Sequence, residues 1–184
     1  MLMRVILYLM FIVLANVITA RFQPVQIGMF HIPWGTFLIG ATFIFRDLVQ
    51  NKYGKGKTYL LILIALILSA VSSYLLGDTL WIVMASALSF LIAESTDTEI
   101  YSRLKLPMSW RVLYSGLVGG LFDSVIFIII GLSPLGSGFI PWEAVPAAII
   151  GQVIVKTIMQ GCGAILLSLM VKNSRFRALI LSHS

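Results

Sequence analysis

The chain has 184 residues, of which 59% are hydrophobic and only 11% are charged, and its mean hydropathy is +1.01. Soluble domains carry about 25% charged residues, so this composition excludes an ordinary soluble protein and indicates an integral membrane protein. The net charge of +6 lies mainly in short loops between apolar runs, which is the topology signal of an inner-membrane protein. We therefore expect the lipid bilayer, and no nucleic acid, as a partner.

Six apolar runs are each about long enough to cross the hydrocarbon core, which takes about 20 residues. In chain order they cover residues 2–20, 33–49, 58–77, 79–101, 112–132 and 144–171. The first run carries its one charge, Arg4, near its start, and no cleavage motif follows it. We therefore interpret it as a retained helix rather than a signal peptide. The sequence predicts an all-α membrane protein in which residues 1–184 form a single domain of six transmembrane helices.

Lysines and arginines predict the orientation of these helices. They gather in the loops after the second and fourth runs and at the two chain ends, whereas the opposite side has only Arg21. By the positive-inside rule, the N- and C-termini should be cytoplasmic, in a multi-pass protein of the inner (cytoplasmic) membrane. On the outer side, residues 22–33 should either cap a cavity or lie on the membrane interface, and residues 133–141 form a second candidate lid.

Charged side chains inside or at the ends of apolar runs cost a few kcal/mol each, so they rarely occur without a partner or a function. Glu94, Asp97 and Tyr101 share one helix face because they are three and four residues apart. Arg46 opposite Glu94 or Asp97 would clamp two helices together. Adjacent helical residues diverge by about 100°, so Arg46 and Asp47 are not expected to point to one spot. For these residues a structural ion pair and a functional role both stay open.

Polar groups also occur near the middle of the fifth and sixth runs. Asp123 lies in the fifth, and Lys156 lies in the sixth with Gln152 and Gln160 one turn to either side. Asn16 adds a polar group to the first run. These groups must face a cavity or one another, and a purely structural Asp123–Lys156 pair is one reading.

The other reading is a wet pocket whose carboxylates accept hydrogen bonds from a ligand with adjacent N–H donors, such as a guanine-like edge. Five nearby rings could stack on a flat heterocycle, although phenylalanines in apolar helices face lipid or the core by default: Phe43, Phe45, Phe90, Phe122 and Phe127.

Signals of an enzyme are weak. The two histidines, His31 and His183, lie in a loop and in the C-terminal tail, and Cys162 is the only cysteine. Neither a metal site nor a nucleophile with its base is therefore expected within the membrane. No phosphate-binding glycine loop is present. We expect no enzymatic activity, no metal and no cofactor.

Several motifs resemble the queuosine precursor transporters, also called the vitamin uptake transporter family. The stretch 33–43, followed by Arg-Asp-Leu-Val-Gln at 46–50 and Tyr-Gly at 53–54, is similar to the second helix of that family. Later motifs agree in order: Glu94-x-x-Asp97 with Tyr101, Asp-Ser at 123–124 before Phe127, and Gln152 with Lys156. The match extends over four of the six predicted helices. It implies a fold similar to the six-helix substrate-binding components of energy-coupling-factor transporters.

The resemblance implies import of 7-deazaguanine precursors of queuosine, such as 7-cyano-7-deazaguanine or its aminomethyl form. Asp123 and Glu94 are then candidates for the guanine-like edge. The other candidate substrate-binding residues are Lys156, Gln152, Asn16 and Phe43. The candidate gate or ion-pair residues are Arg46, Asp47, Asp97 and Tyr101.

Two alternatives remain at this stage. One is uptake of another vitamin-like heterocycle by a binding component of a multi-subunit transporter, and the other is a non-transporting scaffold. Ala15 and Ala20 are five residues apart, unlike the Ala-x-x-x-Ala pattern that docks such components to a coupling subunit. An energy-coupling partner is therefore an open alternative without support from the sequence, and so is a homodimer.

Overall fold

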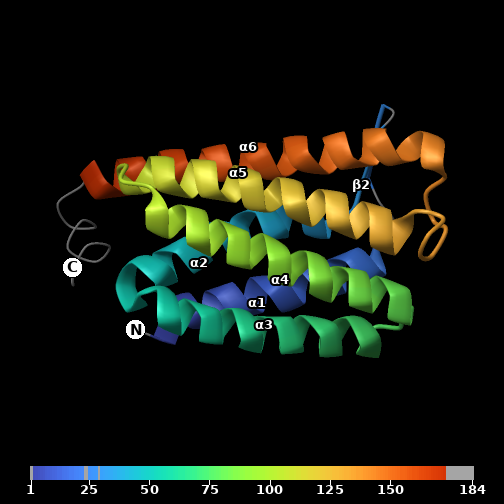
Figure 1. The fold of residues 1–184 in the computed structure, drawn as a ribbon, viewed down its shortest axis with the longest axis horizontal. Coiled ribbons are helices and arrows are strands. Elements are labelled where there is room, and N and C mark those ends of the chain that lie inside the picture. Colours follow the sequence, from blue (N-terminus) through green and yellow to red (C-terminus); the bar gives the residue numbers. More distant parts are fainter. Residues whose placement is uncertain (1, 23–24, 29, 173–184) are drawn as a thin grey trace.

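The computed structural model of the protein describes residues 2–22, 25–28 and 30–172. These residues form six α-helices: α1 (Leu2–Arg21), α2 (Gly35–Tyr53), α3 (Lys55–Leu75), α4 (Leu80–Arg103), α5 (Met108–Ile126) and α6 (Val145–Lys172). Between α1 and α2, strands β1 (Val25–Ile27) and β2 (Phe30–Ile32) pair antiparallel as a short hairpin. The helices alternate in direction along one bundle axis (Figure 1).

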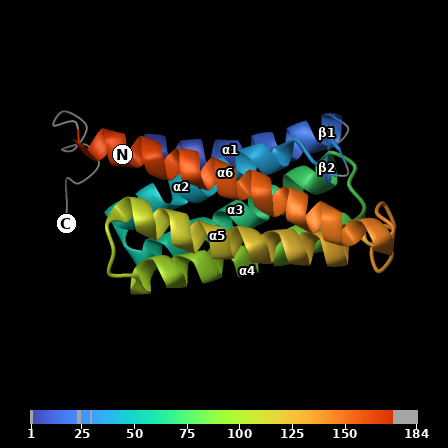
Figure 2. The same cartoon turned by 90° about the horizontal axis from the view of Figure 1, so that it is seen from above.

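The helices close into a ring. Each packs on two neighbours in the order α1, α2, α6, α5, α4 and α3, and α3 packs back on α1. Figure 2 shows the same bundle from a second side, and α6 packs between α2 and α5. Within this ring, α2 also contacts α4 and α5. The arrangement leaves space inside the ring at one end and closes it where α2 crosses to α4 and α5.

The two ends of the bundle differ in charge. One end carries the α2–α3 turn, the α4–α5 link at residues 104–107 and the last turn of α6, and we call it the basic end (Figure 1). Lys52, Lys55 and Arg103 lie there. The opposite end, called the hairpin end, carries the β1–β2 hairpin, the α3–α4 turn and the loop 133–141 (Figure 1). The tight α2–α3 reversal uses Gly54, whose φ of 78° favours glycine.

Four helical segments are long and apolar enough to cross a membrane: Lys55–Leu75, Leu80–Arg103, Met108–Leu132 and Trp142–Ile165. The apolar stretch of α1 among the described residues, Val5–Thr19, is shorter. α2 carries Arg46, Asp47 and Lys52 and is not one of the four. The protein is therefore a multi-pass membrane protein with four candidate spans, and the remaining two spans stay a prediction.

Several element bounds differ from the expected ones. The second run was expected at 33–49, but α2 continues to Tyr53 because its polar last turns are buried against α4. The fifth run was expected at 112–132. Instead α5 begins after Pro107, at Met108, and continues as a π-helical segment over Phe127–Leu132. No strand was predicted within 22–33, and the hairpin there was missed.

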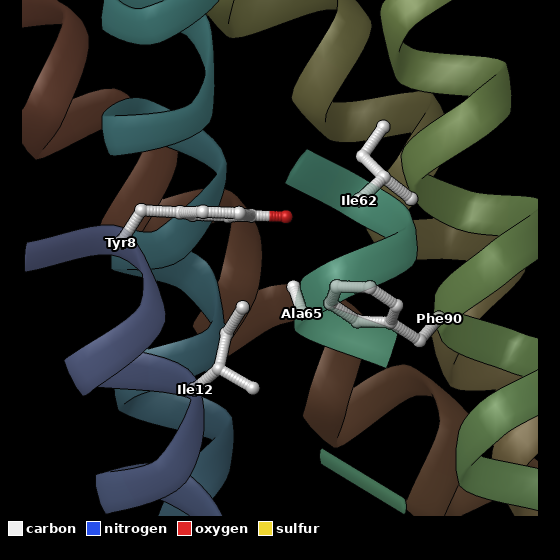
Figure 3. Packing of buried hydrophobic residues seen from close by; sticks show 5 residues of the cluster. All are labelled: Tyr8, Ile12, Ile62, Ala65 and Phe90. Atoms are coloured by element: carbon white, nitrogen blue, oxygen red, sulfur yellow. The ribbon is translucent and has the colours of Figure 1, made fainter. Parts of the chain in front are cut away.

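The apolar core has two parts that matter for the interior of the ring. In the first, Tyr8 and Ile12 of α1 face Ile62 and Ala65 of α3 and Phe90 of α4 (Figure 3). This cluster joins three neighbouring helices on one side of the ring.

The second part lies toward the basic end. Buried Tyr101 of α4 and Val112 of α5 pack with Ile44 and Leu48 of α2 and with Met108. We call these five residues the apolar plug. Because they come from three different helices, they fill the ring where α2 crosses it.

α1 and α2 approach closely at Gly35. A Cβ atom added there would lie 2.7 Å from the carbonyl oxygen of Ala15, so only glycine fits without a shift of backbone. The Gly35 backbone N–H donates to Thr19 Oγ1 at 3.1 Å. This contact fixes the start of α2 against α1, directly beside the hairpin.

Candidate substrate cavity

A cavity of about 580 Å³ lies inside the ring at the hairpin end. This volume is in the range of about 300–1,000 Å³ that is typical of small-molecule sites. Side chains from the connecting segments line its outer part: Phe22, Pro33, Asp78, Phe139 and Pro141. Its floor includes Phe43, Glu94, Asp123, Gln152 and Lys156. Five of the six predicted substrate-binding residues thus meet at one floor, and the sixth, Asn16, lines the wall.

Both predicted lids contribute to the cavity. Phe22 and Pro33 line it from the segment 22–33, which favours a cap over a segment lying only on the membrane interface. The hairpin is anchored by Phe30, whose ring packs on α6 where Gly151 leaves room; a Cβ there would lie 3.0 Å from Phe30 Cβ. From the segment 133–141, Phe139 and Pro141 complete the rim.

An ion pair joins α5 to α6 at the floor. Lys156 Nζ lies 2.7 Å from Asp123 Oδ2 and also donates to Ser124 Oγ at 2.9 Å and to Gln152 Oε1 at 3.2 Å. An ammonium group has three N–H donors, so the hydrogen-bonding capacity of Lys156 is used. The Lys156 side chain is 3% exposed and that of Asp123 is 15% exposed. Of the two charged groups, only the carboxylate remains partly accessible from the cavity.

Gln152 offers the cavity a free donor. Its side-chain nitrogen, Nε2, is buried and has no hydrogen-bond partner within the described residues. A buried donor without a partner costs about 1–3 kcal/mol. A ligand carbonyl or ring nitrogen at this position would remove that cost.

Asn16 has a structural role in addition to its place on the cavity wall. Its Nδ2 donates to the carbonyl oxygen of Ser69 at 3.1 Å, to Ser69 Oγ at 3.0 Å and to Ser72 Oγ at 2.7 Å. The amide nitrogen therefore ties α1 to α3. The sequence predicted a polar group facing a cavity, but the spacing gave no sign of this interhelical contact.

The five candidate rings divide between the cavity and other surroundings. Phe43, Phe90 and Phe127 line the cavity. Phe45 instead packs on Phe11, with ring centroids 5.0 Å apart. Phe122 is 42% exposed and does not line the cavity. The expectation that all five could stack on a ligand was therefore wrong for Phe45 and Phe122, because Phe45 packs on the apolar core cluster and Phe122 is exposed.

Directly next to the floor lies a second charged group, the Arg46 cluster, formed by Arg46, Asp47, Glu94 and Asp97. The guanidinium Nη2 lies 2.8 Å from Asp47 Oδ1 and also contacts Asp97 Oδ2, and Nη1 lies 3.3 Å from Glu94 Oε2. Nη1 also donates to the Glu94 carbonyl oxygen and to Thr98 Oγ1, both at 3.0 Å. The predicted pairing of Arg46 with Glu94 and Asp97 is observed, and the role of these residues as a helix clamp stays a prediction.

The expectation that Arg46 and Asp47 cannot meet was wrong. Their Cα–Cβ bonds diverge, but the arginine side chain is long enough for its guanidinium to turn back to the neighbouring carboxylate. All four side chains of the cluster are at most 1% exposed. The charges are therefore held among α2 and α4, away from lipid.

Further contacts close the ring beyond the cluster. Gln50, one turn after Arg46, donates to the Thr98 carbonyl oxygen at 3.1 Å and to Ser102 Oγ at 2.9 Å. Tyr101, a predicted gate residue, is buried in the apolar plug, and the Arg111 guanidinium lies 3.9 Å from its ring centroid. Sequence reasoning missed Gln50, although its spacing of four from Arg46 placed it on the same helix face.

Glu94 belongs to both groups. It lines the cavity floor and contacts Arg46, so the expected division between pocket residues and clamp residues does not hold for it. Its Oε1 is buried and has no hydrogen-bond partner among the described residues. Glu99 on the same helix differs in every respect: it is 36% exposed and pairs with Lys55 and Arg103.

Comparison with known proteins identifies the family. Residues 73–170, just over half of the chain, match the family described as "Putative vitamin uptake transporter". Neither the search of curated proteins nor the search of solved structures gives a match. The matched range contains the floor residues Glu94, Asp123, Gln152 and Lys156. The chain belongs to the vitamin uptake transporter family.

Proposed function

We propose that the protein imports 7-deazaguanine precursors of queuosine, such as 7-cyano-7-deazaguanine, across the cytoplasmic membrane. Membership of a transporter family implies a non-enzymatic role. The observation that carries the choice of substrate is the cavity floor, where the carboxyl groups of Glu94 and Asp123 lie with the free amide donor of Gln152 and the ring of Phe43. A flat heterocycle with adjacent N–H and carbonyl groups complements this set.

Each floor residue has a distinct part in this proposal. Asp123 accepts hydrogen bonds from the N–H groups of the guanine-like edge, and Lys156 holds the carboxylate in place from the other side. Gln152 donates to a ring nitrogen or carbonyl. Phe43 stacks on the heterocycle, an interaction worth about 1–3 kcal/mol per base in other proteins. A second carboxyl, Glu94, contacts the lactam edge.

The same proposal includes the membrane topology. α1 has 20 residues and α2 has 19, which at about 1.5 Å per residue is close to the thickness of the hydrocarbon core. The charges of α2 are buried against α4, so they need not contact lipid. With all six helices spanning and the basic end in the cytoplasm, the cavity opens outward and the Arg46 cluster closes its inner side.

Uptake in a strain unable to make queuosine precursors tests the function, with queuosine in transfer RNA as the readout. The intact chain should restore queuosine when 7-cyano-7-deazaguanine is supplied. Asp123→Asn should lower uptake about tenfold or more, since a charge-assisted hydrogen bond is worth about 1.5–3 kcal/mol, and Glu94→Gln, which removes the second carboxyl group of the floor, should lower uptake as well. Glu99→Gln, on the exposed part of α4, is the matched control and should behave as wild type. Full rescue by both cavity variants would refute the site.

Binding by the purified protein tests the substrate class. 7-Cyano-7-deazaguanine, its aminomethyl form and guanine share the lactam edge and should bind, whereas adenine lacks that edge and should not. A buried site that must hydrogen-bond its ligand rejects analogues without the matching group strongly. A folded protein that binds none of the three, but binds a vitamin such as thiamine or riboflavin, would replace the proposed substrate with that heterocycle.

A further inference from the structure

The charges of the Arg46 cluster do not balance. Three carboxyl groups surround one guanidinium, so full ionisation would leave two negative charges in excess. Lys156, the other buried cation among the described residues, already pairs with Asp123. Uncompensated charges buried in a protein interior cost several kcal/mol each, and a group in that position binds a proton instead. At least one of the three carboxyl groups should therefore be protonated.

The geometry singles out Glu94 as that group. Asp47 and Asp97 both contact Nη2 of Arg46, while Glu94 has the longest of the three pairs, at 3.3 Å from Nη1. Nη1 already donates to the Glu94 carbonyl oxygen and to Thr98. Glu94 is also the one carboxyl group of the cluster that lines the cavity.

Charged or titratable groups approach Glu94 from five helices. They are Tyr8 of α1, Arg46 and Asp47 of α2, Asp97 of α4, Asp123 of α5 and Lys156 of α6. Carboxyl groups outnumber cations among them. This surplus of acid favours a neutral Glu94 as long as the ring is closed around it.

We propose that Glu94 is a proton-binding site and that the proton it carries drives substrate import. This inference rests on the proposed function, because it takes the cavity to be the substrate site. A neutral carboxyl group has one O–H donor and one carbonyl acceptor, which match the adjacent carbonyl and N–H of a lactam edge. Proton and substrate therefore bind together from the outer side. When the ring opens inward, the substrate leaves, water solvates the Glu94 carboxyl group, and Glu94 releases its proton to the cytoplasm.

Infrared spectroscopy of the purified protein without ligand tests the proton site. At neutral pH we expect a carboxylic-acid carbonyl band that disappears as the pH is raised. The chain has three glutamates, and Glu99 and Glu143 are exposed or partly exposed, so ¹³C-carboxyl glutamate should shift the band in the wild-type protein. Glu94→Gln should remove it, and Asp123→Asn should retain it. A band that is insensitive to glutamate labelling, or absent at neutral pH, would overturn the proposal.

Transport into proteoliposomes tests the coupling, with 7-cyano-7-deazaguanine as the probe. A gradient of about one pH unit, acid outside, should support about tenfold accumulation if one proton moves with each substrate. Glu94→Gln should lose the accumulation that the gradient drives, whereas Asp123→Asn, which binds the probe more weakly but keeps Glu94, should still respond to the gradient. Equal accumulation without the gradient, or in Glu94→Gln, would refute the coupling.

The two experiments separate the proton site from the proposed function. If no 7-deazaguanine binds, the proposed function and the coupling fail, whereas the infrared titration still decides whether Glu94 holds a proton. If the probe binds but the band is not from Glu94, the function stands and the proton site is refuted. Glu99→Gln serves as the folding and labelling control in both.

Discussion

The ion pair between Asp123 and Lys156 makes a prediction that separates stability from transport. Lys156→Met replaces the ammonium by an apolar group of similar length and leaves Asp123, Ser124 and Gln152 without their shared donor. Removal of one partner of a buried pair costs about 3–5 kcal/mol. Asp123 is 15% exposed on the cavity, so water solvates part of the carboxylate, and we expect a loss at the lower end, about 3 kcal/mol.

Removal of the carboxylate instead of the ammonium is expected to destabilise the protein less. Asp123→Asn leaves the Lys156 ammonium buried, but Ser124 and Gln152 still accept from it and the asparagine oxygen can do the same. We expect about 2 kcal/mol of destabilisation. The double variant combines Lys156→Met with Asp123→Asn, so neither an unpaired cation nor an unpaired anion remains. Its loss should be smaller than the sum of the single losses by about 2 kcal/mol, within the range of coupling between contacting residues.

The assay combines unfolding titrations in mixed micelles with 7-cyano-7-deazaguanine uptake on the same four proteins. Stability should recover in the double variant, but uptake should not, because the substrate still lacks the Asp123 carboxylate. The pair Lys55–Glu99, with side chains 45% and 36% exposed, is the matched control and should show less than about 1 kcal/mol of coupling. Strictly additive losses would refute the pair as a unit, and recovery of uptake together with stability would show that the pair is only structural.

Three further predictions concern packing and topology. Gly35→Ala should destabilise the protein by about 1–3 kcal/mol in unfolding titrations because its Cβ meets the α1 backbone. At Gly161 a Cβ would meet no described atom within 4 Å, so alanine there should be neutral or stabilising, and equal effects would refute the close approach. Asn16→Ala should lose about 1–2 kcal/mol through its contacts with α3, and an unchanged unfolding curve would contradict that tie. In a Cys162→Ser background, the Ser86→Cys variant, altered on the cavity wall, should react with an impermeant thiol reagent from outside the cell. Reaction only in inverted vesicles would reverse the orientation.

Much of the site could be predicted from the sequence because charged side chains in apolar helices must pair with one another or face a cavity. Arg46 was expected to pair with an acidic side chain on another helix, and the structure places Glu94 and Asp97 opposite it. Asp123 and Lys156 were the charged groups nearest the middle of two consecutive helices, and they pair directly. In such helices the cost of an unpaired charge restricts the arrangement more than residue spacing does.

The parts that could not be predicted depend on the rotation of each helix and on the ends of long side chains. Spacing gives no absolute helix rotation, so it did not separate Phe43 on the cavity from the exposed Phe122. The turn of Arg46 toward Asp47 depends on side-chain torsions. The hairpin has only three residues per strand, too few for a period-two pattern to stand out.

In the proposed import cycle, inward opening must separate α2 from α4, because these two helices hold the ring closed below the floor. Arg46 and Gln50 together donate four hydrogen bonds to α4, two of them to backbone carbonyl groups whose positions side-chain rotation on α4 does not change. Each of these hydrogen bonds contributes about 1 kcal/mol or more, so together they stabilise the closed state by several kcal/mol. A substrate can open the ring only by binding the open state more tightly by a similar amount. This difference in affinity between the open and closed states can arise at Glu94, because Glu94 both lines the cavity and pairs with Arg46.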